Sequence, residues 1–378
     1  MITKGDDYPI HQTADPIAFS GTDRNFYDRY FFNGYTDDGQ NYFAVAFGVY
    51  PHLNIADAHF SVIRDGKQYS VHASRHLGME RLNLEVGPIA INIIEPLQVL
   101  EVVIDNFEGI SATIRFEGSA FPIQEPRFTH RFGPRAFMDY TRMTQRGTYT
   151  GWIEIDGKKQ QLDEQYSGIR DRSWGIRPVG ESDPQAFAPA VPAGFFWIWA
   201  PVNVAGTSYF FHVCADGNST IWNKRGAIAP DGSSAERIIE VSDTEVICDF
   251  LPKTRYLKSA TVTLRPERGT EISISYQPIT RFLMRGLGYF DKKWHHGKNQ
   301  GPLCIEREDL NPAELNVADT ENVHTQAISR VEVKRNGVMI GSGIGILESL
   351  VQGPNTQFGF SEANDTFQAN FTPVSNRL

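Results

Sequence analysis

One carboxyl group stands out in the charged stretch YSGIRDRSWGIRP at positions 166–178. If this stretch is extended, Asp171 shares a face with Ile169 and Ser173, and Arg170 points to the other face. In an apolar cavity, burial raises the pKa of an Asp, which then stays protonated near neutral pH and can donate a proton. The alternative is structural, because an ion pair between Asp171 and a neighbouring arginine would hold a seam between strands.

Other ionisable side chains are candidates for the same chemistry. Glu348 follows GIGIL much as Asp171 follows SGIR, so it is either a second acid or a structural echo of the first. His295 and His296 are adjacent in KKWHHGKN, so on a strand one ring would face inward as a general base while the other is solvated. His72 and His76 have helical spacing, but Gly78 and the lack of an amphipathic pattern argue against a metal site.

Aromatic side chains and arginines provide the candidate binding residues. The candidates for lining an apolar ligand cavity are Phe32, Tyr35, Trp174, Trp197, Trp199 and Trp294. Aromatic faces stabilise a developing carbocation, although each ring is equally suited to a core. Arg142 lies in an arginine-rich stretch and would hold an anionic group at the cavity mouth or pair with Glu125 or Asp139.

The elements that must position these residues are predicted to be strands. The 378 residues include 25 Phe, 14 Tyr and 33 Gly, a composition typical of half-buried strands and tight turns. Turn pairs at 38–39, 65–66, 156–157 and 336–337 separate alternating runs and favour type I′ hairpins. Helical periodicity is limited to 281–287 and to 125–147, which we interpret as a crossover with one short helix.

The chain is predicted to form two domains. A stretch rich in proline separates residues 1–180 from residues 195–378, with 181–194 as the linker. The two halves are similar, because FFNGYTDDGQNYFAVAFG from position 31 resembles FFWIWAPVNVAGTSYFFHVC from position 195. This pattern favours a duplicated β domain over a short-period repeat.

Several classes of function are disfavoured by the sequence. A formal net charge of −9 without a basic face argues against nucleic-acid binding. Motifs of nucleotide sites, serine hydrolases and zinc sites are missing, so no cofactor and no metal are expected. Three widely spaced cysteines and the lack of a signal sequence or spanning segment predict a cytoplasmic protein without membrane association.

The segments SGIRDRSWGIRP, GLGYFDKKWHHG (286–297) and GIGILESLVQGPNTQFGF (343–360) resemble the tandem-lipocalin superfamily. That superfamily includes carotenoid 1,2-hydratases, AttH-like proteins and fungal decalin-forming cyclases, and the sequence is most similar to a bacterial branch. The resemblance implies an all-β fold of two lipocalin-like (calycin) barrels side by side, with a ligand cavity in or between them. It also implies a catalytic Asp at position 171, although Ile169 stands where the hydratases have Tyr.

The sequence therefore predicts a cofactor-free enzyme that acts on a hydrophobic isoprenoid, terpenoid or polycyclic molecule. The chemistry would be proton transfer at a carbon–carbon double bond, as in a hydratase, dehydratase, isomerase or cyclase. Asp171 would be the acid, His295 or His296 the base, and Glu348 a second acid. The alternative is a non-catalytic carrier or sensor of lipophilic molecules, which needs the same cavity but no titrating group inside it.

Overall fold

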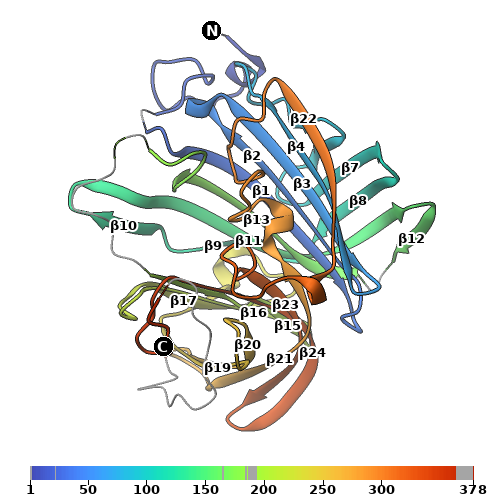
Figure 1. The fold of residues 1–378 in the computed structure, drawn as a ribbon. Coiled ribbons are helices and arrows are strands. Elements are labelled where there is room, and N and C mark those ends of the chain that lie inside the picture. The colour runs from blue at the N-terminus through green and yellow to red at the C-terminus, as the bar shows by residue number, and fades with distance from the viewer. Residues whose placement is uncertain (1, 22, 164–165, 184, 186–193, 363–377) are drawn as a thin grey trace.

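The computed structural model describes residues 2–21, 23–163, 166–183, 185, 194–362 and 378. Nearly all of its regular structure is β, arranged in two large curled sheets that lie one above the other in Figure 1. The prediction of an all-β protein built from two lipocalin-like barrels is confirmed. The predicted linker 181–194 falls largely outside the described residues.

The first sheet has fourteen strands and runs in the order β22-β4-β3-β2-β1-β13-β11-β8-β7-β6-β5, with β9, β10 and β12 also paired to β11. Its strands are β1 Phe26–Thr36, β2 Tyr42–Tyr50, β3 Ile55–Arg64, β4 Lys67–His76, β5 Glu85–Val86, β6 Ile89–Glu95, β7 Val99–Phe107, β8 Ile110–Gly118, β9 Ile123–Gln124, β10 Phe128–Phe132, β11 Arg135–Ile155, β12 Lys158–Leu162, β13 Tyr166–Ile176 and β22 Leu303–Leu310. All pairings within it are antiparallel, as hairpin connections require.

The second sheet has ten strands and runs in the order β18-β17-β16-β14-β24-β23-β21-β20-β19, with β15 beside β16 and β24. Its strands are β14 Phe195–Trp199, β15 Val202–Val204, β16 Thr207–Asp216, β17 Ile221–Pro230, β18 Ile239–Val241, β19 Asp243–Phe250, β20 Leu257–Arg265, β21 Ile272–Leu283, β23 Thr325–Arg335 and β24 Val338–Gln352. Five short 3-10 helices complete the regular structure: η1 Lys4–Asp7, η2 Pro51–Leu53, η3 Ala235–Arg237, η4 Met284–Leu287 and η5 Pro312–Glu314. None of the helices in the described part of the chain has the length and apolar character needed to cross a membrane.

Three of the four predicted turn pairs have the backbone of a type I′ hairpin. Both residues have positive φ in the pairs 65–66, 156–157 and 336–337, which join β3 to β4, β11 to β12 and β23 to β24. In the pair 38–39 only Gly39 has positive φ, at 70°. The turn chemistry of the sequence therefore sets the register of three hairpins.

The stretch 125–147 is not a crossover with a helix, so that prediction is wrong. It follows β9 directly and forms β10 and the first part of β11, a strand of 21 residues. β11 pairs with β12 and β13 on one edge and with β8, β9 and β10 on the other. Hydrogen bonding along both edges outweighs the weak helical periodicity, because strand preference depends mainly on tertiary context.

One strand of the first sheet comes from the second half of the sequence. β22 pairs with β4 in the register Leu303↔Arg75 to Leu310↔Gln68 and forms the edge of the first sheet. In Figure 1 this orange strand lies beside the blue strands of the first barrel. Residues 284–310 therefore belong structurally to both barrels, and this segment carries His295 and His296 along the junction.

Both barrel interiors are filled by side chains. One core lies inside the first sheet and includes Phe32, and another lies inside the second sheet and includes Phe196. A third apolar cluster lies between the barrels, where Phe31 of β1 meets Trp199 of β14 at a ring-centroid distance of 6.3 Å. Space for a ligand must therefore be sought at the junction and not inside a barrel.

Candidate functional site

A cavity of about 590 Å³ lies at the junction of the two barrels. Its walls come from β10 and β11 of the first sheet, from β14, β17 and β24 of the second, and from the segment after η4. Much of the lining is aromatic: Phe132, Phe137, Phe195, Trp197, Trp222 and Phe290. A cavity of this size and character suits an apolar molecule the size of a few fused rings.

Glu348 and His324 form a hydrogen-bonded pair on the cavity wall. His324 Nε2 lies 2.8 Å from Glu348 Oε1, and the carboxylate also accepts from Trp197 Nε1 at 2.8 Å and Gln326 Nε2 at 2.6 Å. Burial alone would raise the pKa of Glu348, but the three donors outweigh burial and lower it. Because a carboxylate only accepts, Nε2 of His324 donates to Glu348, and the Nδ1 atom of His324 is buried and has no partner.

This pair is tied to the first barrel through Gln326. The Gln326 Oε1 atom accepts from Asn33 Nδ2 at 2.9 Å and from Tyr42 OH at 2.5 Å, while its Nε2 donates to Glu348. β1 and β2 therefore fix a side chain of β23, which in turn fixes one of β24. The network makes the position of Glu348 depend on both barrels.

His296 lines the cavity but has no free nitrogen. Its Nδ1 accepts hydrogen bonds from Arg29 at 2.8 Å and from Arg177 at 2.9 Å, and its Nε2 donates to the carbonyl of Leu287 at 2.7 Å. Burial and the two guanidinium charges hold the pKa of His296 well below its usual value. The ring is a neutral acceptor that joins two arginines, so we do not assign it the role of a base.

His295 also lines the cavity, and its Nδ1 atom is buried without a partner. Burial first, and then the positive charge of Arg177, lower the pKa of this ring to about 4. It is therefore neutral at physiological pH. His296 is buried and His295 is half-buried, and both line the cavity, because their segment is a loop and not the strand on which they would face opposite sides.

Asp171 lies on the face of the first sheet that is turned toward the second barrel. It is opposite Phe31 of β1 and Thr144 of β11. No described residue forms a hydrogen bond or ion pair with its carboxyl group, and Arg170 and Arg172 lie on the other face of the strand, as expected. Burial raises the pKa of Asp171 to about 7, against the lowering effect of Arg142. Asp171 is half-buried and does not itself line the 590 Å³ cavity.

The two acids that the sequence comparison of the halves aligned occupy equivalent places. Asp171 is paired with Phe31 across β13 and β1, and Glu348 is paired with Trp199 across β24 and β14. Since Phe31 and Trp199 pack against each other, the two acids approach the junction from opposite barrels. The negative charge of Glu348 contributes to the raised pKa of Asp171.

Arg142 lines the cavity, and the carboxylate of Glu125 neutralises its charge. Its Nε and Nη2 atoms donate to Glu125 Oε2 at 2.9 and 2.5 Å, and Thr144 donates to the other carboxylate oxygen at 2.6 Å. The guanidinium carbon lies 4.9 Å from the ring centre of Trp197. Arg142 is therefore one of a set of aromatic and guanidinium contacts, not a free anion-binding group.

The remaining predicted binding residues are dispersed. Phe32 is in the core of the first barrel, whereas Tyr35 and Trp199 are in the cluster between the barrels. Trp174 is 40% exposed. Trp294 stacks on His72 with ring centres 5.3 Å apart and donates to Glu306, away from the 590 Å³ cavity. Of the six aromatic candidates, only Trp197 lines that cavity.

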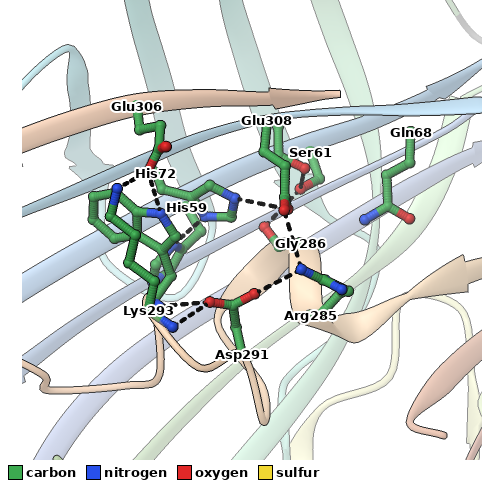
Figure 2. Close-up of polar contacts among 12 residues, drawn as sticks. His59, Ser61, Gln68, His72, Arg285, Gly286, Asp291, Lys293, Glu306 and Glu308 are labelled. Atoms are coloured by element: carbon green, nitrogen blue, oxygen red, sulfur yellow. Dashed lines mark hydrogen bonds and ion pairs between the residues drawn. The ribbon is translucent and has the colours of Figure 1, made fainter. Parts of the chain in front are cut away.

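A polar cluster outside the cavity holds the histidine segment in place (Figure 2). Arg285 bridges Asp291 and Glu308, at 3.1 Å from each. Behind them Ser61 donates to the carbonyl of Gly286 at 2.7 Å. Figure 2 shows that this cluster joins η4 and the following turn to β3, β4 and β22, so the segment enters the cavity with a fixed conformation.

The helical metal spacing of His72 and His76 does not arise, because both residues lie on β4. His72 Nδ1 instead hydrogen-bonds His59 Nδ1 at 2.9 Å. Within the described ranges, no three His, Cys, Asp or Glu side chains are grouped so as to hold a metal ion.

Sequence reasoning missed His324, Tyr289 and the role of Arg177. His324 precedes β23 by one residue, and Gln326 of β23 is paired with Glu348. In NVHTQAIS, His324 and Gln326 are two residues apart and therefore lie on one face of an extended segment. Together with the candidate Glu348, this spacing could have indicated a polar site. Arg177 was part of the charged stretch, but only the fold brings it to His296.

Comparisons with solved structures agree with this architecture. An AttH-like protein of Nitrosomonas europaea is 14% identical, with a TM-score of 0.50, over 91% of this chain and 98% of that chain. CghA bound to Sch210972 is 12% identical, with a TM-score of 0.50, over 86% and 88%. Kievitone hydratase from Nectria haematococca is 11% identical, with a TM-score of 0.46, over 85% and 88%. At these identities the likeness is one of fold.

The sequence itself places the chain in a family. No curated protein sequence matches it. A family model does match, over residues 2–361, and thus covers both barrels and every residue of the cavity wall. The chain accordingly belongs to the family of unknown function DUF8625.

Proposed function

We propose that this protein is an enzyme of the hydratase, dehydratase, isomerase or cyclase type. Its substrate is a hydrophobic small molecule that binds between the two barrels, and its chemistry is proton transfer at a carbon–carbon double bond. The observation that carries the proposal is the position of His324 on the cavity wall, with its Nε2 held by the Glu348 carboxylate and its buried Nδ1 left without a partner. A carboxylate–imidazole pair of this kind is the usual construction of a general base.

The acid in this scheme is Asp171, whose carboxyl group lies outside the lining of the 590 Å³ cavity, so the scheme requires the ligand to extend beyond that cavity to reach it. Its carboxyl group has no ion-pair partner among the described residues, and its pKa of about 7 keeps a large protonated fraction at neutral pH. His295, neutral and on the cavity wall, is placed beside the hydroxyl group or water that is added or removed. The aromatic walls hold the apolar body of the substrate and exclude bulk water.

We expect Asp171→Asn to lower turnover by about 10²- to 10⁴-fold, the usual contribution of a general acid. The measurement is product formation from a panel of terpenoid, steroid and prenylated polycyclic compounds. In the wild type, activity that needs the protonated acid falls as pH rises through about 7. Undiminished turnover in a folded Asp171→Asn protein would remove Asp171 from the mechanism.

Stability gives an independent control on the same variant. Folded Asp171 keeps its proton up to about pH 7, whereas the unfolded chain releases it near 3.8, so the wild-type free energy of unfolding falls as pH rises between these values. Asn carries no charge, so Asp171→Asn has a higher melting temperature than the wild type at pH 8 and a similar one near pH 4. A variant destabilised at pH 8 would indicate a structural ion pair instead.

A further inference from the structure

Two arginines at the histidine end of the cavity lack an acidic partner. Arg29 and Arg177 both donate to Nδ1 of His296, and Arg29 also donates to the carbonyl of Leu287 at 3.3 Å. Their guanidinium carbons lie 4.7 and 5.6 Å from the ring centre of Tyr289. No carboxylate of the described chain lies within ion-pair distance of either one. The shared acceptor is a neutral ring, so two positive charges stand side by side.

The nearby carboxylates are occupied elsewhere. Glu125 is bound by Arg142, and Glu348 by His324, Gln326 and Trp197. Asp57 interacts electrostatically with Arg29 and Arg177. Its carboxyl group, however, accepts hydrogen bonds from Tyr50 OH at 3.1 Å and from the amide of Gly297 at 2.7 Å. These acids moderate the local potential, but none supplies an oxygen to Arg177.

Arg177 is the member of the pair that a ligand can reach. Arg29 is only 2% exposed, and its Nε is buried without a partner, so a ligand in the cavity does not reach it. Arg177 is half-buried and lines the cavity, and none of its nitrogens is among the buried atoms without a partner. A guanidinium has five N–H donors, so the hydrogen bond to His296 leaves other donors of this cavity-lining side chain for a ligand.

We propose that Arg177, backed by Arg29, binds an anionic oxygen of the ligand. This inference rests on the proposed function, because it concerns the same cavity, and it narrows the substrate class. The substrate carries a carbonyl group conjugated to, or adjacent to, the reacting carbon–carbon bond, or a carboxylate next to it. Guanidinium groups favour negative charge and oppose a carbocation, so the double-bond chemistry passes through an enolate.

The corresponding dehydration balances without a cofactor. His324 Nδ1 takes the proton from the carbon next to the carbonyl, and the C–H electron pair forms the enolate, whose oxygen faces Arg177. The carbonyl re-forms as the carbon–carbon double bond is made and the C–O bond to the hydroxyl group breaks. Asp171 gives its proton to the departing hydroxyl, which leaves as water. Hydration is the reverse of the same steps.

Binding of two related probes tests the anion site without any turnover. 1-Anilinonaphthalene-8-sulfonate and N-phenyl-1-naphthylamine share one aromatic skeleton, and only the first carries an anion. Quenching of the tryptophans that line the cavity, Trp197 and Trp222, reports occupancy. We expect the wild type to bind the sulfonate about 10- to 100-fold more tightly than the neutral probe, as charge-assisted hydrogen bonds provide. Equal affinities, or no binding of the sulfonate, would overturn the proposal.

Substitutions show whether the preference for the sulfonate depends on Arg177. Arg177→Gln should abolish the preference for the sulfonate and leave the neutral probe within about twofold, while Arg177→Lys should keep part of it because the charge remains. Arg115→Gln, which removes an exposed arginine paired with Glu117 on β8, should keep the full preference. An unchanged preference in folded Arg177→Gln would reject the site. A preference for the sulfonate without turnover would reject the catalytic proposal alone, and turnover without the preference would reject the anion site alone.

Discussion

His324→Gln is expected to reduce turnover by about 10²- to 10⁴-fold with little change in substrate binding, because the variant lacks the basic Nδ1 atom. Gln at this position can still donate to Glu348, so the wall of the cavity is largely kept. The readout is kcat and KM for whichever compound of the panel is converted. A loss confined to KM would mean that His324 binds the substrate and does not take a proton.

Two further variants separate a catalytic pair from a structural one. Glu348→Gln should also lower kcat, and the double variant should lose little more than His324→Gln alone, because residues that act as a unit are not additive. His76→Gln, at the exposed end of β4, is the matched histidine control, and its kcat should equal that of the wild type. Fully additive losses in the double variant would contradict the pairing of His324 with Glu348.

Glu125→Ala is expected to lower the free energy of unfolding by about 3–5 kcal/mol, the usual cost of leaving one partner of a buried ion pair alone. The side chain of Glu125 is buried, and its loss leaves the Arg142 guanidinium and the Thr144 hydroxyl without their acceptor. Urea unfolding with an unchanged m-value would measure the loss.

The control for this prediction is an ion pair at the surface. Glu117 is 55% exposed in its pair with Arg115, whose side chain is 41% exposed. Glu117→Ala should therefore change the free energy of unfolding by no more than about 1 kcal/mol. If the two Glu→Ala variants were equally stable, Glu125 would not be the counter-ion that maintains Arg142 in the cavity wall.

Local sequence signals were sufficient for three hairpins and for the two faces of β13, whereas the two-barrel architecture was implied by the family resemblance. Asp-Gly and Asn-Gly pairs select the positive φ angles of tight hairpins, and three of them do so here. Alternation placed Asp171 on the face opposite Arg170 and Arg172, and this holds in β13. These properties depend only on neighbours in the chain, which is why they can be read from it.

Long-range placement could not be predicted from the sequence. β22 joins β4 across more than 220 residues, and nothing in LCIEREDL indicates which sheet it completes. Arg177 and His296 are 119 residues apart, so their hydrogen bond requires the two barrels to be assembled. The aromatic residues were predicted as a group to line a cavity. Cores and apolar cavities use the same residue types, so the sequence does not distinguish a core aromatic residue from one that lines the cavity.

The most direct test of the central claim is deuterium exchange at carbon. The wild-type protein and its His324→Gln and Asp171→Asn variants are incubated in D₂O with apolar compounds that bear a carbonyl next to an enolisable C–H or a double bond. Mass spectrometry then follows solvent deuterium in the compound. The account predicts incorporation by the wild type and at least about 100-fold slower incorporation by His324→Gln, whereas Asp171→Asn slows only the incorporation that accompanies addition of water to a double bond. A compound that binds tightly between the barrels and acquires no deuterium would contradict the account. The protein would then be a non-catalytic carrier of lipophilic molecules.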